Sequence, residues 1–550
     1  MTALLLSGLG PAFKSEDVLR GSLFSPDSAA LLAGRYYGGL TLDRLRFRHR
    51  GRTYPLLRRS LGRGSTSLRI DGLSGITAAE VPHLTTTTLE SVLDAAGADY
   101  ESFDLSGVWA GTAEPRSGPS DVNLILLSTT FIWDRRSMSR AINWAASRYP
   151  GVPIVLGGQY SNLKYLPIMA AHPEVHSVVR GDAEEALPLV LRAIDGRYDW
   201  RDVPNLVVRT DSGTIAHNEF RYIDLESHPS PAMHGTRTIV PYESMRGCPF
   251  SCKFCSFPAA SPKWRYKSAH KIANDWARYG DENGAKHIRA SDSTFTVPPT
   301  RLRELLDLLP DVRIGWEAFS RANAIRDAST VERLLAAHCR WLSIGFESMS
   351  DKVLKLMKKQ VTAEANRRAF ELLSASELGY RVSYMIGYPG ETPEDFDATS
   401  SFLRDEFGGH FTLSIFSLQD ETMPVWQDAE ALDLRVDDPD DPDYSWRHVG
   451  MDVQAARRLW REALDDIRWN SDHAVHLLWQ KDYETPLVPW RDPRSNLRLE
   501  KLVERMAMLP QAVTDPRQAE DTARRVLGEL AGEGIEAENG TDLILAAGFR

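Results

Sequence analysis

The sequence predicts an α/β protein with an N-terminal Rossmann-like domain, a central partial (β/α)6 barrel and a mainly helical C-terminal domain. Short apolar runs alternate with amphipathic stretches in the N-terminal third and again in the middle of the chain. Helical periodicity dominates the last part. We place the N-terminal domain at residues 1–200, a linker at 201–235, the barrel at 236–430 and the C-terminal domain at 431–550.

Length, charge and cysteine content limit the class of protein. A chain of 550 residues is long enough for two to four domains, each with its own core. The net charge of −10 argues against a general nucleic-acid binder. No apolar run reaches the roughly 18 residues of a transmembrane helix, so no membrane partner is expected. Four cysteines without a secretory signal favour a cytoplasmic protein with reduced thiols.

The N-terminal domain is expected to be a parallel, doubly wound sheet. Its predicted strands are 3–6, 100–105, 122–128, 153–156 and 177–179, and its predicted helices are 82–96, 138–148 and 183–194. Ligands of such sheets bind outside the carboxyl ends of the strands. Those ends are rich in glycine and small polar residues: Ser128, Thr129, Thr130, Gly157, Gly158, Gln159, Tyr160, Gly181 and Glu184. Glycine lets the backbone approach a flat ligand, although any Rossmann-like sheet ends in this way.

The central domain is expected to contain six β/α units. Its predicted strands are 238–240, 286–290, 312–318, 341–346, 382–386 and 411–416. Its predicted helices are 268–279, 299–309, 331–338, 351–357, 364–378 and 392–405, with Gly379 as a C-terminal stop for the fifth. Active sites of such barrels lie at the carboxyl ends of the strands.

A loop with three cysteines follows the first of these strands. Cys248, Cys252 and Cys255 have the spacing C-x₃-C-x₂-C. Three thiolates on one loop can hold three irons of a [4Fe–4S] cluster and leave the fourth iron open to another ligand. Zinc is the alternative, but it prefers four tetrahedral ligands and no suitable fourth Cys or His lies close in sequence. Cys339 is expected to be a buried core residue without a role in the site.

The cysteine loop resembles the signature of radical SAM enzymes, whose open iron chelates S-adenosylmethionine (SAM). With the preceding domain, the chain resembles the cobalamin-dependent radical SAM enzymes over roughly 1–200 and 235–430. The resemblance implies that the strand-end residues of the first domain bind cobalamin. The motif D-x-H-x-x-G of other cobalamin-binding proteins is absent, so no histidine ligand is expected on the lower cobalt face.

The connection between the first strand and the first helix, residues 8–81, is unusually long. A structureless loop of this length in a compact domain is often functional. It leaves from the edge where cobalamin is expected, and it contains Arg63 and Arg69 among glycines and serines. Arg69 or Arg63 is expected to face the corrin or its phosphate, with a solvated surface arginine as the alternative.

The resemblance also implies a set of SAM-binding residues: Phe254, Asp292, Ser320, Arg321, Glu347, Tyr384 and Pro389. Asp292 could pair with the SAM ammonium, and Arg321 could clamp its carboxylate. Pro389 belongs to a G-x-P-G-E-T turn that is expected to contact adenine, and Phe254 should present backbone to adenine. A strand-end glutamate such as Glu347 is as often a structural cap as a ligand.

The C-terminal domain is expected to close the substrate cavity. Four tryptophans could line an aromatic pocket, although core packing is the default for this residue type: Trp446, Trp469, Trp479 and Trp490. His448 and His476 are possible polar contacts.

The resemblance implies a C-methyltransferase that moves a methyl group from SAM, via methylcobalamin, to a carbon of a small molecule, with an external electron donor. The layout resembles the tryptophan 2-C-methyltransferases of thiopeptide biosynthesis, which implies C2 of L-tryptophan as the acceptor in peptide antibiotic biosynthesis. The alternatives are methylation of another natural-product intermediate and a cobalamin-assisted radical rearrangement without methyl transfer. A tRNA methylthiotransferase is disfavoured, because it needs three more cysteines and only Cys339 remains.

Overall fold

The fold is described for the residues that the computed structural model places. These are 2–8, 45–49, 52–55, 58–59, 66–67, 81–105, 114–132, 135–210, 212–418, 421–438, 445–476, 491–512 and 516–537. The chain divides into two units. The first comprises residues 1–17, 82–249 and 256–285, and the second comprises residues 18–81, 250–255 and 286–550.

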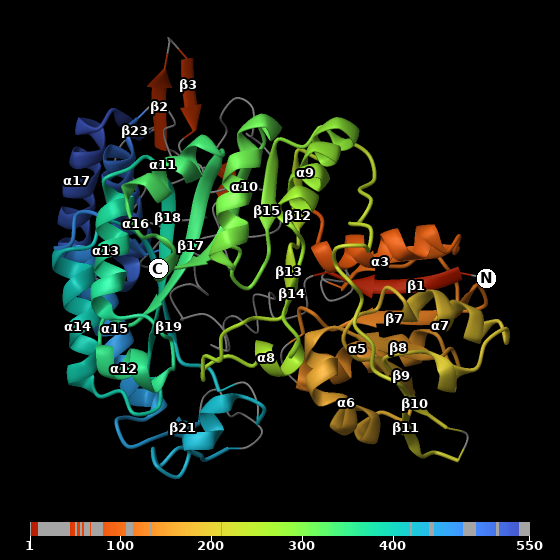
Figure 1. The fold of residues 1–550 in the computed structure, drawn as a ribbon. Coiled ribbons are helices and arrows are strands. Elements are labelled where there is room, and N and C mark those ends of the chain that lie inside the picture. The colour runs from red at the N-terminus through yellow and green to blue at the C-terminus, as the bar shows by residue number, and fades with distance from the viewer. Residues whose placement is uncertain are drawn as a thin grey trace. The chain divides into compact units, whose positions relative to one another are not determined.

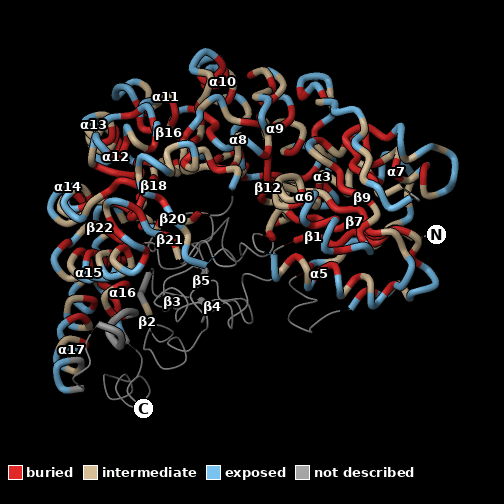
Figure 2. The backbone as a smooth tube through the Cα atoms, turned by 90° about the horizontal axis from the view of Figure 1, so that it is seen from below, coloured by how far each residue is buried: buried red, intermediate tan, exposed pale blue. Residues whose placement is uncertain are grey.

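A seven-stranded sheet forms the centre of the first unit (Figure 1). Its strands, in spatial order, are β11 (Ile215–His217), β10 (Leu206–Arg209), β9 (Val175–Val179), β8 (Ile154–Gly157), β7 (Val122–Ser128), β1 (Thr2–Ser7) and β6 (Tyr100–Asp104). The five strands from β9 to β6 pair in parallel, whereas β10 and β11 are antiparallel. Figure 2 shows that β1 and β7 are buried along most of their length, as their apolar sequences require.

Helices cover both faces of this sheet, and two separate apolar cores result. On one face α5 (Arg135–Arg148) and α6 (Gln159–Ala171) bury residues such as Ile142 and Met169. On the other face α3 (Leu84–Ala95) and α7 (Ala186–Ile194) bury residues such as Leu93 and Val190. The expected α/β class with a doubly wound sheet is therefore confirmed for this unit.

Three features of the structure differ from the sequence-based expectation, two in the first unit and one in the connection 8–81. Helix α6 was not predicted, because its sequence contains Pro167 and its helical geometry is interrupted at Lys164. Residues 206–217 were placed in a linker, but β10 and β11 extend the sheet there. The connection 8–81 was expected to be structureless, yet it contains short strands: β2 (Leu45–His49), β3 (Arg52–Pro55), β4 (Arg58–Arg59) and β5 (Thr66–Ser67).

A parallel sheet with its strands in chain order organises the second unit. Its strands are β15 (His287–Ala290), β16 (Gly315–Arg321), β17 (Cys339–Glu347), β18 (Gly379–Ile386), β19 (Gly409–Ile415) and β22 (Ala474–His476). The first five were predicted within a few residues, and β22 was not predicted. The register brings the strand ends level, since Arg321 is opposite Gly345 and Gly345 is opposite Ser383.

Helices separate these strands or follow them: α10 (Pro299–Val312), α11 (Ala328–Ala336), α12 (Asp351–Leu356), α13 (Ala363–Ser374), α14 (Pro393–Asp405), α15 (Val453–Asn470), α16 (Pro493–Ala512) and α17 (Pro516–Gly532). Several of these helices are preceded by a residue whose side chain accepts a hydrogen bond from a backbone N–H of the first turn, as at Asp327 and Thr362. The prediction that Gly379 ends a helix was wrong. Helix α13 ends at Ser374, and Gly379 begins β18, where a Cβ would collide with the ring of Trp341.

Several residues singled out in the sequence lie outside the described part of the chain, namely Arg63, Arg69, Trp479 and Trp490. Cys339 is fully buried at the start of β17, and burial raises the pKa of its thiol, as expected of a core residue. Trp446 is 1% exposed and is part of an apolar core of the second unit. Among the described helices, none is long and apolar enough to cross a lipid bilayer.

Candidate functional site

The cysteine loop begins directly after two short strands of the first unit. β12 (Ile239–Tyr242) leads to β13 (Met245–Arg246), which pairs with β14 (Arg265–Tyr266). Gly247 follows with a φ of 77°, and a Cβ there would lie 2.6 Å from the carbonyl oxygen of Lys263. Only glycine therefore fits at the residue before Cys248.

The rest of the loop is fixed by backbone hydrogen bonds within the second unit. The N–H of Lys253 donates to the carbonyl of Met357 at 2.9 Å, and the carbonyl of Lys253 accepts from the N–H of Val425 at 3.0 Å. The N–H of Cys255 donates to the carbonyl of Cys252 at 3.2 Å. The backbone between Cys252 and Cys255 is therefore hydrogen-bonded to two other segments of the unit, at Met357 and at Val425.

The donor set of the loop suits an iron–sulfur cluster. None of the three cysteines forms a disulfide, and Cys252 is buried while the other two are half-buried. Within the described ranges, no three His, Cys, Asp or Glu side chains converge on one metal-ion position. In a [4Fe–4S] cluster each thiolate binds an iron of its own, so three thiols spaced along one loop fit that group.

Arg321 lies against this loop. Its Nη1 is 3.6 Å from Cys252 Sγ, and its guanidinium carbon is 3.8 Å from the centre of the Phe250 ring. The other terminal nitrogen donates to the carbonyl of Lys359. Arg321 was expected to clamp the SAM carboxylate. The structure places it beside a cluster cysteine, and its contact with SAM stays a prediction.

Glu347 ends β17 with a positive φ of 66° and is 8% exposed. Its Oε1 is 2.8 Å from Lys359 Nζ, and that ammonium lies 5.6 Å from the centre of the Phe254 ring. The ion pair occupies one carboxylate oxygen. Glu347 therefore has a structural partner in addition to any role toward SAM. The Phe254 ring itself packs at the border of an apolar core.

Buried polar groups lie after the end of β15 and at the end of β16. Asp292 and Ser320 are 2% and 5% exposed, and Ser320 Oγ lies 3.0 Å from Thr296 Oγ1. The buried hydroxyl of Thr294 has no hydrogen-bond partner among the described residues. An orphaned buried hydroxyl at a strand end is suited to a polar ligand. The sequence pattern did not single out Thr294.

The turn after β18 is buried and held by hydrogen bonds. Glu391 Oε2 accepts the N–H of Gly387 at 2.6 Å, while its Oε1 has no partner among the described residues. Burial raises the pKa of Glu391 to about 8. Pro389 is buried within the turn. Tyr384, in β18, is fully buried, and its hydroxyl has no hydrogen-bond partner among the described residues.

The strand ends of the first unit form a second group of predicted residues. Ser128 is level with Gly157 in the sheet, and its Oγ is 3.3 Å from Thr130 Oγ1. Thr129 donates its hydroxyl to the carbonyl of Gly157 at 2.8 Å. Gln159 and Tyr160 lie in the first turn of α6. The structure therefore brings these residues to one edge of the sheet.

Gly157 and Gly158 differ in what surrounds them. A Cβ at Gly157 would meet none of the described residues within 4 Å, so these residues leave space beside its backbone. Gly158 has a φ of 103°, and a Cβ there would lie 2.7 Å from the backbone nitrogen of Thr130. The open space at Gly157 is the kind of cradle that a flat ligand can occupy.

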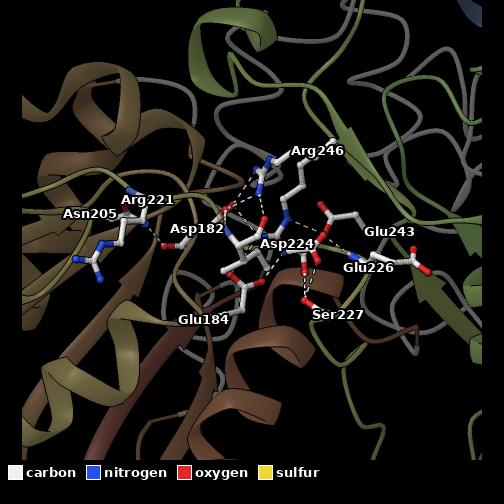
Figure 3. Close-up of polar contacts among 11 residues, drawn as sticks. Asp182, Glu184, Asn205, Arg221, Asp224, Glu226, Ser227, Glu243 and Arg246 are labelled. Carbon is white, nitrogen blue, oxygen red and sulfur yellow. Dashed lines mark hydrogen bonds and ion pairs between the residues drawn. The ribbon is translucent and has the colours of Figure 1, made fainter.

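Glu184 does not face this edge freely. Figure 3 shows Asp182 and Glu184 pointing toward Arg246 of β13. Arg246 Nη1 donates to Asp182 Oδ1 at 2.8 Å and to Glu184 Oε2 at 3.1 Å, and Arg265 holds the other oxygen of Asp182 at 2.6 Å. Burial alone would raise the pKa of Glu184, but the Arg246 guanidinium holds it below its usual value. The expected contact of Glu184 with cobalamin therefore competes with a buried ion pair.

The segment that carries the cysteine loop and the strand ends after it matches a known family. Residues 242–403 fit the model of the Radical SAM superfamily. A radical SAM domain uses a [4Fe–4S] cluster and SAM, in agreement with the three reduced cysteines of the loop. The turn at 387–392 and the polar strand ends lie within the matched segment.

Curated relatives of the chain include methyltransferases. An uncharacterised methyltransferase of Pyrococcus horikoshii is 24% identical over 302 residues, covering 52% of this chain and 64% of that protein. The cobalamin-dependent radical SAM methyltransferase TokK of Streptomyces tokunonensis is 22% identical over 321 residues, covering 54% and 46%. This chain thus spans about half to two-thirds of the length of these relatives. The radical SAM domain is therefore similar to domains of cobalamin-dependent methyltransferases.

A solved structure shares the fold over most of the chain. The radical SAM methyltransferase TsrM of Kitasatospora setae, solved with cobalamin and a [4Fe–4S] cluster, matches with a TM-score of 0.56 and 14% identity. The match covers 83% of this chain and 98% of that one. At this identity the likeness shows a common fold.

Proposed function

We propose that this chain is a cobalamin-dependent radical SAM C-methyltransferase acting on a small molecule. One observation carries the proposal. A doubly wound sheet, whose carboxyl edge at Gly157 has no described residue within 4 Å of a Cβ, precedes a radical SAM segment whose loop carries three cysteines without disulfides. The cobalamin-dependent enzymes similar to this chain support the same combination.

In this proposal each group of residues has a binding task. Cys248, Cys252 and Cys255 hold the cluster, and the polar strand ends of the second unit hold SAM. The edge at Ser128–Thr130 and Gly157–Tyr160 holds cobalamin by backbone approach and hydroxyl hydrogen bonds. Cobalamin supplies a carrier for the methyl group between SAM and the acceptor carbon. The protein holds SAM and acceptor in a fixed orientation and excludes water.

SAM would be held by polar groups that are already buried away from water. Asp292 is suited to an ammonium group and Thr294 offers a free hydroxyl in the described part of the chain. The turn at Gly387–Thr392 presents backbone for a planar base. The rigidity of this turn limits the entropy lost when a ligand binds.

L-Tryptophan is our first candidate for the acceptor, with methylation at C2. A structure of TsrM with its tryptophan substrate and a SAM analogue matches this fold with a TM-score of 0.53, 15% identity, and coverage of 81% and 97%. That likeness and the layout of the chain support the candidate. Methylation of another natural-product intermediate is the second candidate.

The test is product analysis with anaerobically reconstituted protein, SAM, cobalamin, reductant and a panel that contains L-tryptophan. Methyl-tryptophan without 5′-deoxyadenosine would support polar transfer to an aromatic carbon. Methylated product with stoichiometric 5′-deoxyadenosine would support radical transfer. 5′-Deoxyadenosine without any methylated product would contradict methyl transfer and support a rearrangement.

Two cysteine variants provide the matched control. Replacing Cys252 with Ala removes a proposed cluster ligand, whereas replacing buried Cys339 with Ala removes a thiol outside the loop. We expect C252A to lose iron and all activity and C339A to keep its iron. Methylation by C252A would contradict the cluster assignment.

A further inference from the structure

The buried guanidinium of Arg321 lies against the sulfur of Cys252, and binding of SAM does not account for this contact. Arg321 is 5% exposed and Cys252 is 7% exposed, with 3.6 Å between Nη1 and Sγ. This geometry is that of a hydrogen bond from a cation to a sulfur. It therefore joins β16 directly to a proposed cluster ligand.

Two further contacts fix the guanidinium in place. It stacks over the Phe250 ring at 3.8 Å, and its second terminal nitrogen donates to the carbonyl of Lys359. A planar fork can make these three contacts at once, whereas a lysine ammonium cannot. The arrangement therefore specifies arginine, and it aims one N–H at the sulfur.

The positive charge of Arg321 has no carboxylate partner in the described ranges. The neighbouring cation, Lys359, is paired with Glu347 at 2.8 Å. A buried charge without a counter-charge is strongly unfavourable. Cys252 would supply the missing negative charge once its thiolate binds iron. The loop and Arg321 are thus complementary only when an anionic cluster is present.

We propose that Arg321 is a positioning residue that raises the reduction potential of the cluster through Cys252. The inference rests on the proposed function, because it requires the cluster. One-electron reduction by the external donor adds a negative charge to the cluster. A fixed adjacent cation stabilises that reduced form more than the oxidised form, and hydrogen bonds to ligand sulfurs act in the same direction.

The experiment is a redox titration of the reconstituted cluster, with its EPR signal recorded against potential. It compares wild type with R321M and R321Q, which are neutral, and with R321K, which keeps the charge. R367M is the matched control, since Arg367 forms an exposed ion pair with Glu406 in the same unit. Iron and sulfide content are measured for every variant.

At a fixed potential we expect the ratio of reduced to oxidised cluster to fall at least about tenfold in R321M and R321Q. This corresponds to a midpoint about 59 mV more negative for a one-electron couple. R321K should shift less, and R367M should titrate like wild type. Two neutral variants of different shape are used because a variant that takes up no iron has no midpoint to measure. The other variant then supplies the result.

A neutral variant with full iron content and the wild-type midpoint would overturn the inference. A wild-type protein that assembles no cluster would overturn the proposed function itself. Because the titration needs neither cobalamin nor methyl transfer, the two failures are distinguishable. An equal shift in R367M would also overturn the inference, since it would show a general charge effect.

Discussion

His448 binds both ends of the turn that follows β18. Its Nδ1 accepts the N–H of Gly390 at 3.2 Å, and its Nε2–H donates to the carbonyl of Gly387 at 3.2 Å. The ring stacks on Trp446 with 5.4 Å between centroids. This one side chain, from 58 residues further along the chain, therefore stabilises the turn that we propose contacts SAM.

Replacing His448 with Ala should weaken SAM binding. The change leaves buried backbone groups of Gly387 and Gly390 unpaired, which costs about 2–3 kcal/mol of stability. Denaturant unfolding measures that loss, and equilibrium dialysis of the reconstituted protein measures SAM affinity. The matched control is V449A, one residue away at a side chain that is 68% exposed. Equal SAM affinity in H448A and V449A would show that the turn does not depend on His448.

His448 should also make stability depend on pH. Burial lowers the pKa of His448 from 6.5 to about 4, so the neutral form is favoured in the folded state. Its stabilising contribution is complete above pH 6.5 and is lost as the pH falls toward 4, by about 3 kcal/mol.

Denaturant unfolding from pH 7 to pH 4 tests this dependence by comparing wild type with H448Q, which does not titrate. Wild type should lose about 3 kcal/mol more than H448Q over this range. His476, whose pKa burial lowers to about 3, is present in both proteins and cancels. Parallel curves would contradict the assignment.

Gly157 and Gly158 allow stability and cobalamin binding to be separated. G158A should destabilise the protein by about 1–3 kcal/mol, because φ is 103° and the new Cβ meets Thr130. G157A adds a methyl group where no described residue lies within 4 Å, so stability should change little while cobalamin affinity falls. Thermal unfolding and the visible spectrum of bound cobalamin report the two effects. G157A with wild-type cobalamin affinity would show that the corrin lies elsewhere.

The Arg246 ion pairs should be mainly structural. R246M leaves Asp182 and Glu184 buried without this partner and should cost about 3–5 kcal/mol. In the double variant R246M/E184Q much of this loss should return, because one buried charge is removed with its partner. A double-mutant cycle in denaturant gives the coupling free energy. A coupling near zero would free Glu184 for the cobalamin contact first expected of it.

Features that depend on residues close together in the sequence could be predicted from it. The cysteine spacing and most of the apolar strands of both sheets follow from neighbouring residues alone, whereas β10, β11 and β22 were missed. The contacts of Arg321 with Cys252, of Arg246 with Glu184 and of His448 with Gly390 join residues 69, 62 and 58 positions apart. Nothing in a single sequence pairs such residues.

Short or irregular elements were missed for a related reason. Helix α6 lacks a regular apolar face and contains Pro167, and β22 has only three residues. Their positions follow from packing against neighbours, as when β22 pairs with β19. Tertiary contacts, and not the propensity of the local sequence, therefore determine that α6 and β22 form.

The most direct test of the central claim is the fate of the SAM methyl group in the presence and absence of cobalamin. The reconstituted protein is incubated with SAM deuterated on its methyl group and with the acceptor panel, and products are analysed by mass spectrometry. The account predicts a C-methylated product that carries three deuterium atoms and forms only with cobalamin. A deuterated product formed equally well without cobalamin, or no methylated product from any acceptor, would contradict it.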